Sequence, residues 1–106
     1  TAKLPETWTH NEEWYSFDRS VRGREEFHVL LSVDESTYSP EAHLLWMDTD
    51  LRMGDHPVVW TRCIGNGRVF FSALGHQAAA YDAPEYVSVL RGAVTWAARQ
   101  EGEGCD

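Results

Sequence analysis

The feature that most constrains this chain is a pair of strand-forming runs joined by a tight-turn sequence. Residues 57–63 and 68–74 are rich in β-branched and aromatic side chains, and the sequence IGNG at 64–67 separates them. Glycine and asparagine tolerate the positive φ angles of short hairpin turns. The pattern therefore predicts a β-hairpin. Because these glycines join two strands, we interpret them as turn residues rather than as a phosphate-binding loop.

An amphipathic helix is predicted after the hairpin. Asp82 is the expected N-cap, Pro84 lies in the first turn, and Glu85 follows the cap by three residues. Residues 100–106, with two glycines and three acids, are expected to form a fraying tail or a linker. Helical spacing places six apolar residues on one face of the helix: Tyr86, Val89, Leu90, Ala93, Val94 and Ala97.

The first half of the chain is harder to interpret. Residues 27–33 form a nearly continuous apolar run, typical of a strand buried on both faces, and His28 within it is expected in the core. Residues 35–55 are predicted to be a long loop with one helical turn, either functional or a variable surface insertion. With 106 residues the chain suits one domain, yet one helix cannot cover both faces of a sheet. Either the loop hides a helix, or the chain is part of a larger domain.

Charge excludes some classes of partner. Nine Lys and Arg against 17 Asp and Glu give a net charge of -8, whereas nucleic acid and anionic membranes require basic surfaces. No apolar run is long enough to span a membrane. No basic and then apolar leader opens the sequence, so we expect a cytoplasmic protein or a piece whose leader lies elsewhere.

The two cysteines allow two interpretations. Cys63 lies in an apolar strand-like run, which favours a buried and inert thiol. The alternative is a single bridge between Cys63 and Cys105 if the protein is secreted. Neither cysteine has a partner at metal-ligand spacing.

Three groups of residues could carry chemistry, although no self-sufficient catalytic motif occurs. The first group is Glu12, Glu13, Trp14 and Tyr15. Adjacent carboxylates and aromatic rings can bind a sugar, or the acids form an exposed turn while the aromatic rings lie in the core. His56 directly precedes a predicted strand, where it could act as an acid, a base or a metal ligand, or could bond to Asp55 and cap the loop.

The third group is His76, which follows Gly75 at the end of a predicted strand. Open α/β sheets bind their ligands at the carboxyl ends of strands. A hydrogen bond from His76 to a backbone carbonyl is the structural alternative, and we favour the functional interpretation.

Five segments in order resemble the second half of a ThuA-like domain, a family named for trehalose utilisation. They are EEWYSF, HVLLSVDESTY, MGDHPVVW, GNGRVFFSALGH and the helix ending in TWAA, and together they span about residues 4–98. The resemblance implies an α/β fold: the C-terminal portion of a flavodoxin-like three-layer sandwich similar to class I glutamine amidotransferases. Residues 1–99 would be the C-terminal half of the domain and 100–106 a tail or linker.

The resemblance also implies functional roles. In the amidotransferase relatives a catalytic histidine follows the strand matched by residues 68–74, and His76 occupies that position. Their nucleophilic cysteine lies in the half that has no counterpart here, so glutaminase activity is not implied. Processing of trehalose, other disaccharides or keto-sugars is implied instead. Family members also occur inside large secreted bacterial proteins, so both cytoplasmic and extracellular settings are open.

We therefore expect a carbohydrate-active domain whose cleft lies at the carboxyl end of the sheet. His76 would act as general acid or base with His56 as its partner, and Glu13, Tyr15 and Asp55 would contact the sugar. The two histidines and a carboxylate could also hold a divalent metal. The alternatives are a non-catalytic glycan-binding or structural module of a multidomain protein, and a half-domain that assembles with its missing N-terminal half or with itself.

Overall fold

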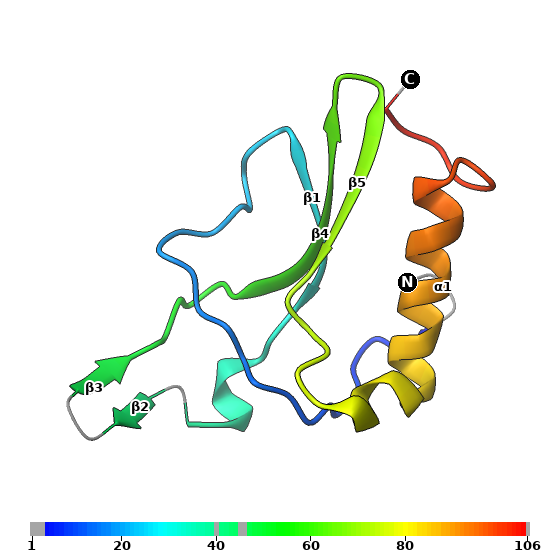
Figure 1. Ribbon diagram of the computed structural model, residues 1–106. Helices are drawn as coiled ribbons and strands as arrows, with labels where there is room; N and C mark the ends of the chain where they lie inside the picture. The colour runs from blue at the N-terminus through cyan, green and yellow to red at the C-terminus, as the bar shows by residue number, and fades with distance from the viewer. Residues whose placement is uncertain (1–3, 40, 45–46, 106) are drawn as a thin grey trace.

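The computed structural model describes residues 4–39, 41–44 and 47–105. It is a small α/β structure with an antiparallel sheet and one C-terminal α-helix (Figure 1). The elements in chain order are β1 (Phe27–Ser32), η1 (Glu35–Thr37), β2 (Glu41–Leu44), β3 (Met47–Asp50), β4 (Pro57–Ile64), β5 (Gly67–Ser72), η2 (Ala78–Asp82) and α1 (Pro84–Ala97).

The predicted hairpin is confirmed as β4 and β5. Ile64 pairs with Gly67, so Gly65 and Asn66 alone form the turn. Gly65 has a φ of 58°, a conformation that favours glycine. Strand β1 pairs antiparallel with β4, which gives the strand order β1-β4-β5.

The prediction that residues 27–33 form a strand is confirmed, but their burial on both faces is wrong. β1 is an edge strand, and none of its residues is fully buried. His28, expected in the core, is exposed. An apolar run does not distinguish a central strand from an edge strand whose apolar side chains pack against aromatic rings. Here the Phe27 and Trp60 rings pack edge to face, with their centroids 6.4 Å apart.

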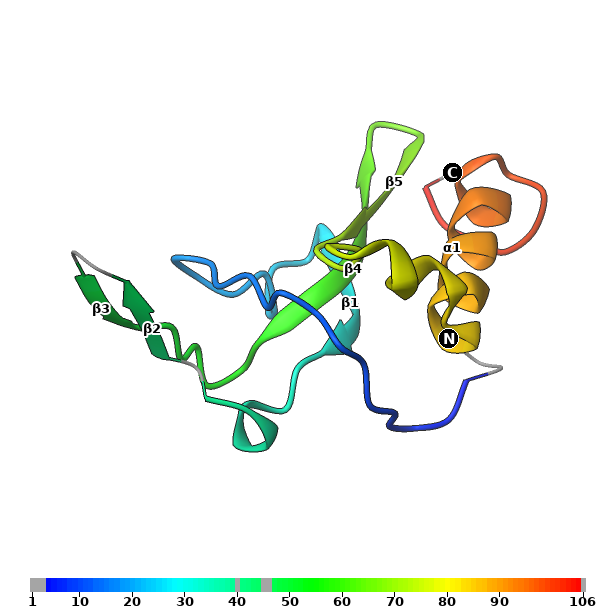
Figure 2. The same cartoon turned by 60° about the horizontal axis from the view of Figure 1, so that its bottom comes forward.

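The long loop predicted over residues 35–55 is also wrong. It contains the short helical turn η1, as expected, and also a second hairpin in which Glu41 pairs with Asp50 and Leu44 with Met47. This two-stranded sheet projects away from the main sheet (Figure 2). The segment lacks clear apolar alternation, so its pairing left little trace in the sequence.

Helix α1 is confirmed, with corrections at both ends. Asp82 is not the N-cap, because it ends η2, and Ala83 caps the helix without a side-chain hydrogen bond. Pro84 occupies the first turn, as predicted. Val94 is 68% exposed, so the apolar face is shorter than the spacing indicates.

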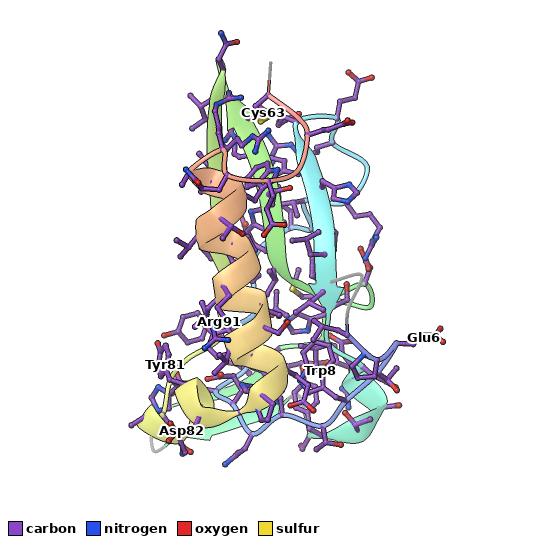
Figure 3. The ribbon with its side chains drawn as sticks, turned by 90° about the vertical axis from the view of Figure 1, so that its right-hand side faces the viewer. Glu6, Trp8, Cys63, Tyr81, Asp82 and Arg91 are labelled. Atoms are coloured by element: carbon purple, nitrogen blue, oxygen red, sulfur yellow. A yellow bond between two sulfur atoms is a disulfide. The ribbon has the colours of Figure 1, made fainter. Side chains whose placement is uncertain are left out.

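The core lies between the first turns of α1, η2 and the sheet. Ala80, Tyr86 and Val89 are buried there. Seven partly buried residues pack against them: Leu4, Trp8, Leu31, Phe70, Leu74, Ala83 and Leu90. Figure 3 shows α1 in front of the sheet, with Trp8, Tyr81 and Asp82 near one end of the helix and Cys63 near the other.

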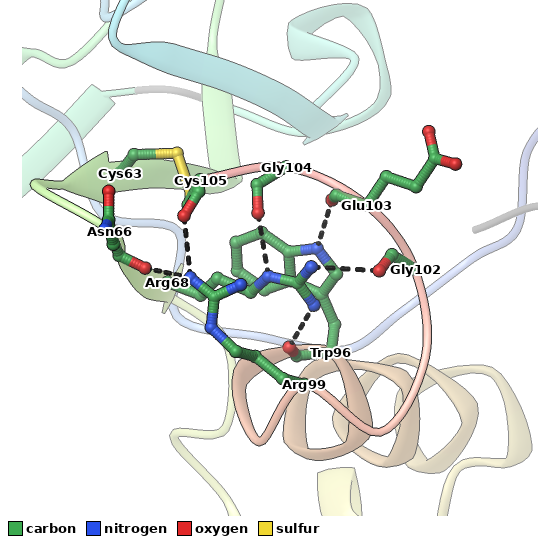
Figure 4. The surroundings of a disulfide bond; sticks show 9 residues. All are labelled: Cys63, Asn66, Arg68, Trp96, Arg99, Gly102, Glu103, Gly104 and Cys105. Carbon is green, nitrogen blue, oxygen red and sulfur yellow. Dashed lines mark hydrogen bonds between the residues drawn. A yellow bond between two sulfur atoms is a disulfide. The ribbon is translucent and has the colours of Figure 1, made fainter.

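Residues 100–105 fold back onto the sheet rather than fraying, and we call them the C-terminal strap (Figure 4). A disulfide joins Cys63 to Cys105, so the interpretation of Cys63 as a buried free thiol is wrong. Arg68 donates to the carbonyl oxygens of Gly104 at 3.0 Å and Gly102 at 2.9 Å, and its guanidinium lies 5.1 Å from the centre of the Trp96 ring. The turn-proximal end of the hairpin is therefore tied to the end of α1.

No helix in the described part of the chain is both long and apolar enough to cross a membrane.

Candidate functional site

The two ends of the main sheet carry different residues. β1 and β5 end, and β4 begins, at one end, which we call the site end; the hairpin turn and the C-terminal strap lie at the other, the strap end (Figure 1). Ala73 donates to the carbonyl of Val58, and Val33 donates to that of His56. Antiparallel pairing therefore places the residue before β4, His56, and the loop after β5, which contains His76, at the same end of the sheet.

A buried carboxylate, Glu12, joins the N-terminal segment to the loop after β5. Its side chain is 0% exposed, and it accepts from the backbone N–H groups of Gly75 at 2.6 Å and His76 at 2.8 Å. Burial raises the pKa of Glu12, but bonds from Gly75, His76, Glu13 and the His10 ring outweigh it and hold the pKa below 4.5. Glu12 thus fixes the backbone at Gly75 and His76, next to two exposed side chains.

Those side chains are His76 and Glu13. The His76 Nε2 atom lies 3.4 Å from a Glu13 carboxylate oxygen, and the two side chains are 50% and 53% exposed. Asn11 donates to the side-chain oxygen of Gln77 at 3.3 Å beside them. The site end therefore presents an accessible carboxylate–imidazole pair flanked by an amide pair.

Gly75 is required where it stands. Its φ is 102°, and a Cβ at this position would clash with the ring of Tyr81, whose hydroxyl donates to the Gly75 carbonyl at 3.0 Å. The close approach of Tyr81 sets the direction in which the chain leaves β5. The backbone on the N-terminal side of His76 is thus fixed from two sides, by Glu12 and by Tyr81.

His56 is held quite differently. It is 1% exposed, and its ring nitrogens face Glu35 at 2.9 Å and the Tyr15 carbonyl at 2.7 Å. Both partners are hydrogen-bond acceptors, and the Tyr38 hydroxyl also lies 3.4 Å from the Nδ1 atom. The bond from the Met53 N–H, with further bonds from His56 and the Gly54 N–H, lowers the pKa of Glu35. This His56–Glu35 pair links three separate segments of the chain.

Asp55 does not bond to His56 but to a turn before β1. Its carboxylate accepts from Arg22 at 2.8 Å and from Ser20 at 3.0 Å. The Arg22 guanidinium, which also donates to Ser32, lowers the pKa of Asp55. Asp55 therefore has a local partner in the structure.

The structure thus separates the five predicted site residues into three places. Glu13 and His76 form an exposed pair, His56 is buried against the Tyr15 carbonyl while the Tyr15 ring is half exposed, and Asp55 binds Arg22. Within residues 4–39, 41–44 and 47–105, no three His, Cys, Asp or Glu side chains are arranged to hold a metal ion.

Sequence reasoning missed two organising carboxylates. Glu12 stood in the acidic pair that was singled out, but its sequence gives no sign that it is the buried member while Glu13 is exposed. Glu35 lies 21 positions before His56, and nothing in its local pattern marks it. Only the tertiary fold brings Glu35 to the histidine.

Comparison with known proteins gives one match. The family model described as ThuA, trehalose utilisation, matches residues 1–97. No curated protein and no solved structure matches the chain significantly. At the level of the family, the match implies a role related to trehalose utilisation.

Proposed function

Because the chain belongs to the ThuA family of trehalose utilisation, we propose that its site end binds a disaccharide or keto-sugar through His76 and Glu13. The observation that carries this proposal is the exposed pair formed by these side chains, 3.4 Å apart, on a backbone held by the buried Glu12. A site held on fixed backbone loses little conformational entropy when its ligand binds.

The chemistry of the pair suits a sugar. A carboxylate accepts hydrogen bonds from hydroxyl groups, and an imidazole can donate or accept a proton near neutral pH. Tyr15 and Tyr81, each 50% exposed, supply rings on which the C–H faces of a sugar can pack. In the proposed reaction His76 is the general acid or base and Glu13 orients it and contacts a hydroxyl.

We assign His56 a positioning role in this proposal rather than contact with the sugar. Its burial and its contacts with Glu35, the Tyr38 hydroxyl and the Tyr15 carbonyl leave neither ring nitrogen free for a ligand. Its bond to the Tyr15 carbonyl instead holds the segment that carries Glu13 and Tyr15. Asp55, which binds Arg22, stabilises the turn before β1.

The test is a titration of the whole chain with trehalose, followed by the backbone amide signals in NMR spectra. We expect the signals of Glu13, Tyr15 and His76 to move together. His76→Ala should weaken binding at least about tenfold, which corresponds to about 1.4 kcal/mol. His28→Ala, which removes another exposed histidine, is the control and should bind like the wild type.

Unchanged trehalose binding by the His76→Ala variant would contradict the proposal that His76 forms part of the sugar site. Signal changes confined to residues away from the site end would place the sugar elsewhere. Turnover of the sugar measured in the same samples separates catalysis from simple binding.

A second candidate function is that of a non-catalytic glycan-binding module within a larger protein. The burial of His56 favours it, because among the described side chains at the site end His76 is then the accessible histidine, without a second one to form a catalytic pair. In this case trehalose or another glycan binds without turnover, and His76→Ala weakens binding only modestly.

We further propose that the chain is the C-terminal portion of a larger flavodoxin-like three-layer sandwich. The dimensions of the chain support this proposal. Its radius of gyration is 15.1 Å, whereas a compact domain of this length has a radius of about 13 Å. The accessible surface is 7458 Å², against about 6,000 Å² for a compact monomer of this mass. Sedimentation measured over a range of concentrations tests whether this excess surface binds a second copy of the chain. Association would support the proposal of a partial domain, and a strictly monomeric chain would argue against that proposal.

A further inference from the structure

A cavity of about 450 Å³ lies between the main sheet and α1, on the side of the strap end. It shares no lining residue with the proposed sugar site. The size falls within the range of about 300–1,000 Å³ typical of small-molecule sites. Six of the residues that line it have large apolar or aromatic side chains or are alanine: Phe27, Leu30, Phe70, Val89, Ala93 and Trp96.

Gly92 leaves this space open. It stands inside α1 and lines the cavity, and a Cβ built on it would meet no atom within 4 Å. Glycine in a helix interior lowers stability relative to alanine, and here close packing against the sheet does not require it. The helix therefore has a glycine, which stabilises helices less than alanine does, at a position where a larger side chain would narrow the cavity.

The C-terminal strap forms another part of the wall. Glu103, Gly104 and Cys105 line the cavity, and the disulfide to Cys63 with the Arg68 hydrogen bonds holds them there (Figure 4). The wall on this side is consequently fixed by a covalent bond, which makes the cavity a built feature of the fold.

Charges on the cavity wall are predominantly negative. Glu25, Glu26 and Glu103 line it, against the single guanidinium of Arg62. Glu26 is paired with Arg24 at 2.7 Å, whereas Glu25 and Glu103 have no ion-pair partner within the described part of the chain. An anion would be repelled by these carboxylates, and a cation would be attracted.

We propose that this cavity binds an apolar molecule that carries one positive charge, of the alkylammonium or arylammonium class. The apolar body lies against Phe27, Phe70 and Trp96, and the ammonium group lies near Glu25 and Glu103. The exposed carboxylates favour such a cation over neutral or anionic molecules of the same size. The Phe27 ring already faces the guanidinium groups of Arg24 at 4.9 Å and Arg62 at 5.0 Å, and the Trp96 ring faces that of Arg68 at 5.1 Å, so the rings supply apolar contact rather than the preference for a cation.

The first test compares three probes with the same chain and different heads: octylammonium, octanol and octanoate, each below the concentration at which it aggregates. Binding to the intact chain is followed by the amide signals of Gly92 and the indole N–H signal of Trp96. We expect octylammonium to bind most tightly, octanol more weakly and octanoate least. No response to any probe, or tighter binding of octanoate, would overturn the proposal.

The second test fills the cavity. Gly92→Leu should abolish binding of octylammonium while the protein remains folded, and Gly92→Ala should weaken binding. Val94→Leu enlarges an exposed side chain on the same helix, and it should leave binding unchanged. If Gly92→Leu does not fold, Gly92→Ala and the three-probe series still decide. Unaltered binding by Gly92→Ala and a folded Gly92→Leu would place the probe elsewhere.

The third test removes the charges. The Glu25→Gln and Glu103→Gln substitutions together should weaken octylammonium binding roughly three- to tenfold, since the carboxylates are exposed and screened. They should leave octanol binding unchanged. Glu6→Gln, which neutralises an exposed carboxylate outside the cavity, controls for the overall charge of the chain. An equal effect from Glu6→Gln would mean non-specific attraction and would contradict the proposal.

Discussion

The two ends of the main sheet are stabilised by different chemistry. At the strap end, a disulfide and the guanidinium of Arg68, which bonds to backbone carbonyls, join the hairpin to the end of α1. At the site end, the carboxylates of Glu12 and Glu35 accept from backbone N–H groups and from histidines. Reduction of the disulfide is therefore expected to destabilise the strap end, whereas protonation of the carboxylates in acid is expected to destabilise the site end.

A second contrast lies within the site end, where three histidines each face a glutamate. The side chains of the His10–Glu12 pair are 7% and 0% exposed and those of the His56–Glu35 pair 1% and 13%, whereas both side chains of the His76–Glu13 pair are about half exposed. The same pair of residue types thus serves the fold in two places and faces solvent in the third. Burial, which the local sequence did not reveal, distinguishes a structural pair from a candidate site.

The largest effect is expected from opening the strap end. Replacing Cys63 and Cys105 together by serine removes a cross-link between residues 42 positions apart. By chain entropy this lowers the free energy of unfolding by about 4 kcal/mol. Urea unfolding of the double variant measures the loss. Sugar binding at the site end should survive it in the folded fraction, and loss of both together would mean that the two ends are not independent.

Breaking the His56–Glu35 pair at the site end should have the next largest effect. His56→Ala removes a side chain that is 1% exposed and leaves the Tyr15 carbonyl without its partner, while Glu35 keeps its bonds from the Met53 and Gly54 N–H groups. The substitution should cost about 3 kcal/mol of unfolding free energy. Denaturant unfolding at neutral pH measures it. His28→Ala, at an exposed histidine, should change the same quantity by less than about 0.5 kcal/mol. Similar losses in both variants would erase the distinction between buried and exposed histidines.

The Glu12 carboxylate should give an intermediate effect that depends on pH. Glu12→Gln keeps the shape but loses the charge, and at pH 7 it should cost about 2 kcal/mol. Glu12 and Glu35 have pKa values below 4.5 in the folded protein, so their stabilisation is present above that pH. It is lost as the pH falls through the folded pKa values. The acid-induced loss should therefore be smaller in Glu12→Gln.

Stability measured from pH 7 to pH 3 checks the sign. An equal acid-induced loss in the wild type and Glu12→Gln would show that Glu12 does not contribute to it. Glu13→Gln is the matched control, because it alters the neighbouring exposed carboxylate.

The smallest effect on stability is expected at the candidate site itself. His76→Ala should change the free energy of unfolding by less than about 0.5 kcal/mol, because its contact with Glu13 is exposed and long. The same variant should bind the sugar at least about tenfold more weakly. A large loss of stability would instead place His76 with His56 as a structural residue.

The elements with a strong local pattern were predictable from the sequence. The β4–β5 hairpin carries a Gly-Asn turn between two apolar runs, and α1 carries helical spacing with Pro84 in its first turn. The β2–β3 hairpin lacks such a pattern, and Asp82 resembles a cap although η2 extends through it. A local sequence pattern reflects the conformational preference of that segment alone. The β2–β3 hairpin and the extent of η2 depend on contacts with the surrounding chain.

The candidate site was only partly predictable, for the same reason. The position of His76 after β5 followed from the order of strands, and Glu13 was recognised as an acid beside aromatic rings. Its pairing with His76 spans 63 positions of sequence, and that of Glu35 with His56 spans 21. Such long-range contacts leave no periodic signal, so the roles of Glu12 and Glu35 emerged only from the fold.

The most direct test of the difference between the two ends is residue-resolved hydrogen exchange at a series of pH values from 7 down to 2, corrected for intrinsic rates. The amides of Gly75 and His76 donate to Glu12, those of Met53 and Gly54 to Glu35, and that of Gln100 to a backbone carbonyl. We predict that acid lowers protection at the first four amides and leaves Gln100 protected. Equal loss at all five, or unchanged protection at Gly75 and His76, would contradict the account.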